Sequence, residues 1–172
     1  MAVVTNTSPV IVLAKIQRLG LLKDLYGSVL MPPNVKVECI DKGKLSGAKD
    51  VVEIENGLRQ GWIQLVNLDR EQIRQVKGLI DGARIGFGEA EALVLAKSKN
   101  ILVVLDDKEA RVIAKSWNLE YTSTVMVLYE AFERSLISYD ELVEDLAKLT
   151  RVMWISTDVI TEIFRKAEKV RK

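Results

Sequence analysis

The chain has 172 residues, which suits one domain large enough to bury a continuous core. Its 25 Lys and Arg residues balance 24 Asp and Glu residues, and this near-neutral charge excludes the strong basic field of a nucleic-acid coat protein. There is no His, which excludes Ser-His-Asp triads and imidazole zinc sites, and the single Cys39 excludes an internal disulfide. Any acid–base or metal chemistry must therefore come from carboxylates.

Short runs rich in β-branched residues alternate with longer helical patterns, which predicts an α/β fold with a parallel sheet between two layers of helices. The predicted strands cover residues 2–5, 29–31, 62–66, 101–105 and 120–121. The first run lacks the basic flank of a signal peptide, and no apolar run is long enough to span a membrane. We therefore expect a soluble, cytoplasmic protein with no membrane partner.

Proline marks two predicted helix starts, because its missing N–H costs nothing in the first helical turn. Pro9 and Pro33 both follow a predicted strand directly. A capping box formed by Ser138 and Glu141 predicts another start, for a helix that ends at Leu149. Further helices are predicted over 47–60, 70–79, 88–99, 107–117 and 125–134, and a last one from 157.

Two polar segments follow predicted strands at the place where a ligand site is expected. The run 101–105 has no polar residue, as is typical of a central strand buried on both faces. If the strand order is 3-2-1-4-5, this strand lies beside the first one, and ligands bind beyond the carboxyl ends of such strands. The segments at that edge are Asn6-Thr7-Ser8 and Asp106-Asp107.

Two glutamates are further candidates. On a helical wheel Glu89 shares the stripe of Ala92 and is expected to point inward, whereas Glu91 falls on the side of Ser98 and is expected to point outward. Glu38 lies in a short helical segment after the second strand.

Each candidate also has a simpler interpretation that depends only on local structure. Asn6 and the Asp106-Asp107 pair can cap the helices that follow them. Glu89 can favour its helix N-terminus through the helix dipole, and Glu38 can be a solvated helix position. Their joint occurrence favours a functional site over these alternatives.

Four motifs together resemble the PIN-domain superfamily, and in particular its prokaryotic branch of predicted nucleic-acid-binding proteins. They are VVTNTSP, VxxE after two prolines, GEAEAL and LVVLDDKEAR, and they occur in the family's order over residues 1–135. The resemblance implies a three-layer α/β/α fold around a mostly parallel sheet of order 3-2-1-4-5. Residues 1–135 would form the PIN-like domain, and residues 136–172 would form a C-terminal helical extension of it.

The resemblance also implies a site for Mg²⁺ or Mn²⁺ and metal-dependent hydrolysis of single-stranded RNA. The residues at the family's ligand positions are Asn6, Glu38, Glu89 and one of Asp106 and Asp107, of which Asp107 is slightly favoured. The family's hydroxyl near the last strand falls on Ser123 or Thr124. Hydrogen bonds to phosphate or water would come from Thr7, Ser8 and Thr124, and local positive charge from Lys42, Lys44, Lys49 and Arg111.

Asn6 departs from the family pattern, in which active nucleases normally have Asp at this position. An amide oxygen can still coordinate a cation, but the missing negative charge weakens its attraction for a hard divalent ion. Two hypotheses follow. One is an active nuclease which, by resemblance, is a toxin with a small antitoxin-like partner and forms a homodimer.

The other hypothesis is a weak or inactive PIN-like module that binds RNA or protein. A third fold class, a receiver-like or nucleotide-binding α/β domain, also places paired acidic residues after strands. It is less favoured because no lysine follows the last predicted strand.

Overall fold

The computed structural model describes residues 2–45 and 47–170, and within them the centre of the molecule is a five-stranded sheet. Every strand pair is parallel, and the order is β3-β2-β1-β4-β5. The strands are β1 (Ala2–Thr5), β2 (Ser28–Met31), β3 (Ile63–Leu65), β4 (Val103–Val104) and β5 (Tyr121–Thr122). The predicted α/β class and strand order are confirmed.

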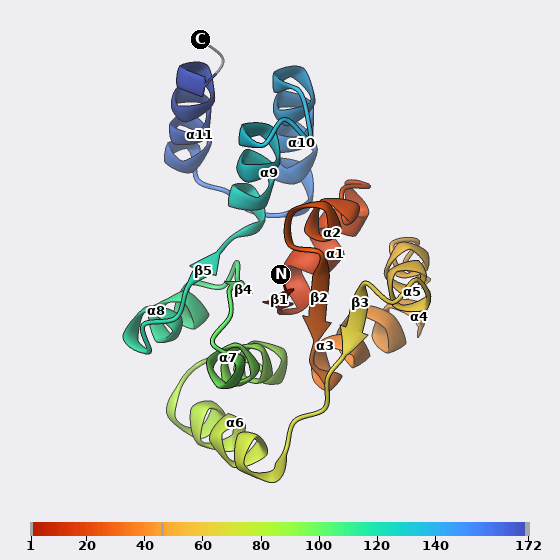
Figure 1. Cartoon of the computed structure of the whole chain (residues 1–172), viewed down its shortest axis with the longest axis vertical. Coiled ribbons are helices and arrows are strands. Elements are labelled where there is room, and N and C mark those ends of the chain that lie inside the picture. The colour runs from red at the N-terminus through yellow and green to blue at the C-terminus, as the bar shows by residue number, and fades with distance from the viewer. Residues whose placement is uncertain (1, 46, 171–172) are drawn as a thin grey trace.

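Helices cover both faces of the sheet (Figure 1). Those before the third strand are α1 (Thr7–Lys15), α2 (Gly20–Tyr26), α3 (Pro33–Lys36), the π-helix η1 (Val37–Asp41), α4 (Lys42–Leu45) and α5 (Val51–Arg59). Those after it are α6 (Arg70–Gly82), α7 (Phe87–Lys99), α8 (Lys108–Ser116), α9 (Thr124–Glu133), α10 (Tyr139–Val152) and α11 (Thr157–Val170). None of them, in the part of the chain that is described, is long and apolar enough to cross a membrane.

The strand predicted over 101–105 is shorter in the structure, where β4 covers two residues and its neighbour β5 is equally short. Beyond β4 the pairing continues with one bond, from Leu105 N–H to the Thr122 carbonyl at 2.8 Å. Val103, Val104 and Leu105 are all fully buried. The apolar run therefore marks a buried segment of the chain, of which β4 is the regular part.

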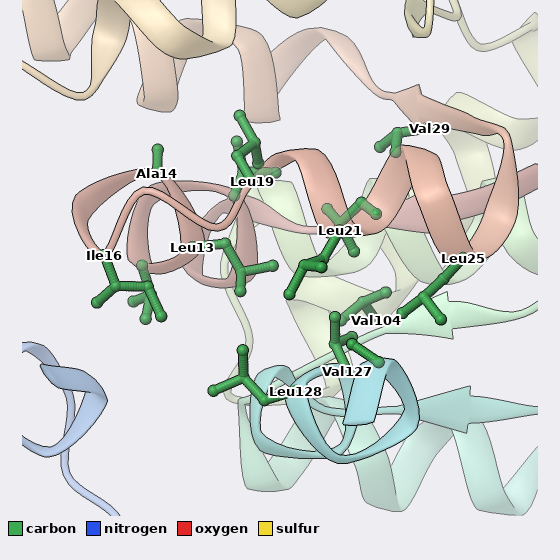
Figure 2. Close-up of a cluster of buried hydrophobic side chains, with 14 of the residues drawn as sticks. Leu13, Ala14, Ile16, Leu19, Leu21, Leu25, Val29, Val104, Val127 and Leu128 are labelled. Atoms are coloured by element: carbon green, nitrogen blue, oxygen red, sulfur yellow. The ribbon is translucent and has the colours of Figure 1, made fainter. Parts of the chain in front are cut away.

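The sheet has a separate apolar layer on each face, because successive side chains of a strand point to opposite sides. Val3 and Val104 contribute to the layer formed with α1, α2 and α9, and Val4 and Val103 contribute to the layer formed with α6, α7 and α8. Figure 2 shows the first layer, where leucines of α1 and α2 face Leu128 of α9. Two packed layers hold the ends of β1 and β4 in fixed positions.

The last two helices gather with α9 at one end of the molecule (Figure 1). Three leucines of α10, at positions 142, 146 and 149, are fully buried and belong to the same cluster as α1 and α2. Helix α11 adds Ile163 and Ala167 to that cluster. The predicted C-terminal extension thus falls on helices that share the core of the first layer.

Candidate functional site

Three consecutive polar residues follow β1 at the carboxyl edge of the sheet. Asn6 has an extended backbone, with φ −90° and ψ −172°, and is the N-cap residue of α1. Thr7 and Ser8 therefore lie in the first turn of α1, beside the end of β4, which pairs with β1. Because the strand ends and the helix begins within one residue, the three side chains spread in different directions.

Each of these three residues donates a hydrogen bond to a carboxylate from a different part of the chain. The bonds run from Asn6 Nδ2 to Glu89 Oε1 at 3.3 Å, from Thr7 Oγ1 to Glu38 Oε2, and from Ser8 Oγ to Asp106 Oδ2 at 3.3 Å. The carboxylates come from α7, from η1 and from the segment after β4. The fold therefore brings six of the predicted site residues into one connected group.

The two neighbouring aspartates after β4 have different surroundings. Asp106 is half-buried, and it accepts hydrogen bonds from the backbone N–H of Thr124 at 2.9 Å and from the Thr124 hydroxyl at 2.6 Å. Asp107 is exposed and caps α8, since its Oδ1 accepts the N–H of Ala110 at 2.8 Å. The geometry places Asp106 in the connected group and gives the slightly favoured Asp107 a capping role instead.

The start of α9, just after the last strand, supplies one hydroxyl to the group. Thr124 is fully buried and contacts Asp106, whereas Ser123 caps α9 by accepting the N–H of Met126 at 3.4 Å. Of the two hydroxyl positions predicted, the structure therefore brings only Thr124 to the acidic residues.

Two glycines at the start of α7 make room for the carboxylates. A Cβ atom on Gly88 would lie 3.0 Å from both Glu38 Oε2 and Thr7 Oγ1, and a Cβ on Gly86 would lie 2.6 Å from Glu89 Oε2. Gly88 opens the GEAEAL motif, but sequence reasoning assigned neither glycine a role, although their spacing around Phe87 at a helix start was a visible signal. Both glycines leave the space beside the start of α7 in which these side-chain oxygens now lie.

The negative charge of the group has no cationic partner within residues 2–45 and 47–170, where none of the ion pairs involves Glu38, Glu89 or Asp106. Asn6 is 0% exposed, and its Oδ1 has no hydrogen-bond partner. The orientation of the amide is fixed by chemistry, because an ionised carboxylate can only accept and so requires Nδ2 toward Glu89. A buried acceptor without a donor is costly and calls for a water or a cation.

An all-oxygen donor set with uncompensated charge fits a hard divalent cation. In the described residues, no three His, Cys, Asp or Glu side chains are grouped closely enough to hold a metal by themselves. The hydroxyls and the amide of residues 6–8 lie between the carboxylates instead. Mg²⁺ commonly uses one or two carboxylates and completes its shell with water and phosphate, so this arrangement is compatible with it.

The expectation that Glu91 points outward was wrong. Glu91 is only 8% exposed, and its carboxylate accepts the backbone N–H of Asn34 at 2.8 Å and the Asn34 side-chain Nδ2 at 2.6 Å. The helical-wheel argument assumed one buried face, but α7 packs against β1 and β4 and also against α3, α6 and α8. Its nearly continuous apolar sequence was the signal for burial on several sides.

Three of the predicted basic residues lie on helices and the fourth, Lys49, lies in a turn. Lys42 and Lys44 are exposed on α4, which continues directly from the helix that carries Glu38, and Lys44 forms an ion pair with Glu55. Lys49 is exposed in the segment before α5. Arg111 is half-buried on α8, one turn after the Asp107 cap.

One comparison with known proteins gives a match that covers almost the whole chain. A family model, DUF3368, described as a PIN domain, matches residues 2–169. The match includes α10 and most of α11 as well as the sheet. No curated protein sequence matches the chain.

Proposed function

The chain belongs to the PIN-domain family, whose fold is of the nuclease type, and on that premise we propose that it is a divalent-metal-dependent ribonuclease. Its substrate would be single-stranded RNA, cleaved at a phosphodiester bond. The observation that carries the proposal is the set of hydrogen bonds from residues 6–8 to three carboxylates that have no cationic partner among the described residues. The unpartnered, buried Oδ1 of Asn6 lies in the same group.

The cation would be held through oxygen atoms only, by ligands drawn from Glu38, Glu89, Asp106 and the amide oxygen of Asn6. Because no three acidic side chains of the described residues are grouped closely enough to hold a metal by themselves, one or two carboxylates would bind it directly and water would complete its shell. Mg²⁺ or Mn²⁺ in such a site activates a water molecule and neutralises charge on the phosphate. Asp106 takes the place of the slightly favoured Asp107 in this proposal because Thr124 orients both of its oxygens.

The remaining polar groups would orient the ligands and the substrate. The hydroxyls of Thr7, Ser8 and Thr124 already bind the carboxylates, which limits how far these can rotate. The exposed Lys42 and the half-buried Arg111 would attract phosphates on either side of the group, with an affinity that falls as salt rises. Lys44 contributes less, since Glu55 neutralises it.

A matched pair of variants tests the proposal. In Asp106→Asn a carboxylate of the group becomes an amide, whereas Asp107→Asn changes the neighbouring residue to another good N-cap. Cleavage of a single-stranded RNA should need Mg²⁺ or Mn²⁺, stop with a chelator, and be lost in Asp106→Asn and Glu89→Gln. It should persist in Asp107→Asn. The opposite result for the two aspartates would reject this assignment of ligands.

The second candidate function is a weak or inactive PIN-like module that binds RNA or protein, and Asn6 is the residue that favours it. An amide in place of a carboxylate removes one negative charge and reduces the attraction for a cation. Tight RNA binding without divalent-dependent cleavage, in wild type and Glu89→Gln alike, would support this candidate over the nuclease.

The resemblance to toxin ribonucleases extends the proposal to a toxin with a small antitoxin-like partner, acting as a homodimer. Its test is expression in a bacterial host. Growth should stop with the wild-type chain and continue with Glu89→Gln at equal protein level. Unchanged growth in both cases would reject the toxin role and leave the biochemical proposal intact.

A further inference from the structure

Glu91 is a buried carboxylate that the proposed cation site does not use. It is 8% exposed and has no ion-pair partner among the described residues. Both of its oxygens are occupied by a single residue, Asn34, at 2.8 Å and 2.6 Å. A buried charge normally requires compensating hydrogen bonds, and among the described residues Glu91 accepts both of its bonds from Asn34, at the beginning of α3.

The beginning of α3 needs an acceptor from elsewhere in the fold. Helix N-termini leave several N–H groups without partners, and a side-chain oxygen of the N-cap residue usually accepts one of them. In α3 the N-cap is Pro32 and the next residue is Pro33, and neither has a side-chain oxygen. Glu91 supplies the missing acceptor from α7, and its negative charge also suits the positive end of the helix.

The residue that Glu91 holds lies on the same helical face as a proposed cation ligand. Asn34 and Glu38 are four residues apart in the continuous helical stretch of α3 and η1, so they share one face. On α7, Gly88 and Glu91 are three residues apart and also share a face. Gly88 lies against Glu38 and Thr7, while Glu91 binds Asn34.

We propose that Glu91 is a positioning residue that sets the location of Glu38 in the cation site by fixing the start of α3 to α7. The two helices meet at two points along matching faces. Gly88 permits the close approach at Glu38, and the Glu91–Asn34 contact fixes the relative rotation and height of the helices. Glu91 acts through Asn34 and touches neither cation nor substrate. The inference rests on the proposed function, because it assumes that Glu38 is a ligand.

A charge-exchange pair of substitutions separates this role from a general loss of stability. Glu91→Gln removes the negative charge of the acceptor, and its amide N–H₂ can bind the Asn34 side chain only if the Asn34 amide turns over to present its oxygen. Asn34→Asp alone places two carboxylates in contact. In the double variant the new amide oxygen can accept the N–H of residue 34, and the new amide nitrogen can donate to the new carboxylate. The double variant therefore restores both bonds and the local charge.

The measurements are Mn²⁺ affinity by titration calorimetry and hydrogen exchange of the amides of residues 34–38. Loss of a residue that orients a ligand typically weakens metal binding by about 10-fold to 100-fold. We expect a loss of that size in Glu91→Gln and in Asn34→Asp, faster exchange over 34–38, and recovery of both in the double variant. Glu130→Gln is the control, because Glu130 is also partly buried and hydrogen-bonded across the fold, to Tyr26. It should change neither measurement.

The possible failures can be told apart. If wild-type protein binds no Mn²⁺, the cation site itself is rejected, and the orienting role is rejected with it. If wild type binds Mn²⁺ and Glu91→Gln binds it equally well with unchanged exchange over 34–38, the cation site stands and the role of Glu91 is overturned. A double variant that binds Mn²⁺ as weakly as the single variants would also overturn the role of Glu91, since both hydrogen bonds between residues 91 and 34 would then be present without restoring the affinity.

Discussion

Asn6→Asp changes the charge of the site at its most buried position. The amide that now donates to Glu89 at 3.3 Å would become a second carboxylate at the same separation. Two unit charges at that distance repel by about 5 kcal/mol at an effective dielectric constant of about 20. Protonating one carboxyl group with an ordinary pKa of about 3.9 at pH 7 costs only about 4 kcal/mol. The pair would therefore take up a proton, and about 4 kcal/mol is the upper limit of the penalty.

The expected results concern both the apo protein and the cation complex. For a chain of this length about 4 kcal/mol lowers the melting temperature by roughly 8 to 16 °C at most, measured by calorimetry at pH 7 with a chelator. Repulsion raises the pKa of the new carboxyl pair, so the penalty is present at neutral pH and disappears as the pH falls below about 4. Mn²⁺ should bind more tightly to the variant and raise its melting temperature more than that of wild type. Cleavage of single-stranded RNA should rise with it.

A double variant provides the control. Asn6→Asp combined with Glu89→Gln exchanges the two ends of the hydrogen bond and restores a single negative charge. Its apo melting temperature should return close to that of wild type. If Asn6→Asp alone leaves both the apo melting temperature and the Mn²⁺ affinity unchanged, position 6 lies outside the acidic group and the reasoning about charge is refuted.

Three further variants test other parts of the structure. Mn²⁺ should raise the melting temperature of the wild-type protein and of Asp107→Asn, but not that of Asp106→Asn. Thermal scans with and without Mn²⁺ measure this difference. Gly88→Ala places a methyl group 3.0 Å from Glu38 Oε2, so calorimetric titration should show weaker Mn²⁺ binding with little loss of stability, and unchanged binding would contradict the close approach. Arg18→Met removes the cation 2.5 Å from the fully buried Asp145 and leaves it the more distant Lys148 Nζ at 3.8 Å, which should destabilise the fold by about 3 kcal/mol in urea unfolding at pH 7. Because burial raises the pKa of Asp145, that loss should shrink as the pH falls, and a loss that grows with acid would contradict it.

The sequence predicted the sheet well because its signals there are strong and local. The run 101–105 is entirely apolar, and proline marks the helices that begin at positions 7 and 33. The helices that were missed lack such signals. Helix α2 has no side-chain cap at its start, and α4 buries none of its residues. Both are determined by packing and by continuation of the preceding segment.

The parts of the site that the sequence left open depend on contacts between distant residues. The choice between Asp106 and Asp107 depends on the residue at which the strand ends and the helix begins, and sequence patterns locate such boundaries only to within a few residues. The burial of Glu91 depends on Asn34, which is 57 residues away along the chain. A helical wheel contains no information about a partner at that distance.

The amide at position 6 links the two proposed functions through one free-energy balance. Three carboxylates already meet residues 6–8 without a cationic partner in residues 2–45 and 47–170, so each further charge makes the apo state less stable and the cation complex more stable. With Asn6, the apo group is held by hydrogen bonds from the protein itself, and within the described part of the group the buried side-chain oxygen that lacks a partner is Asn6 Oδ1. The balance between these states sets the cation concentration at which the site fills. In a nuclease the site would be filled at the Mg²⁺ or Mn²⁺ concentration at which the enzyme acts. In a binding module the site would remain in the hydrogen-bonded apo state at that concentration.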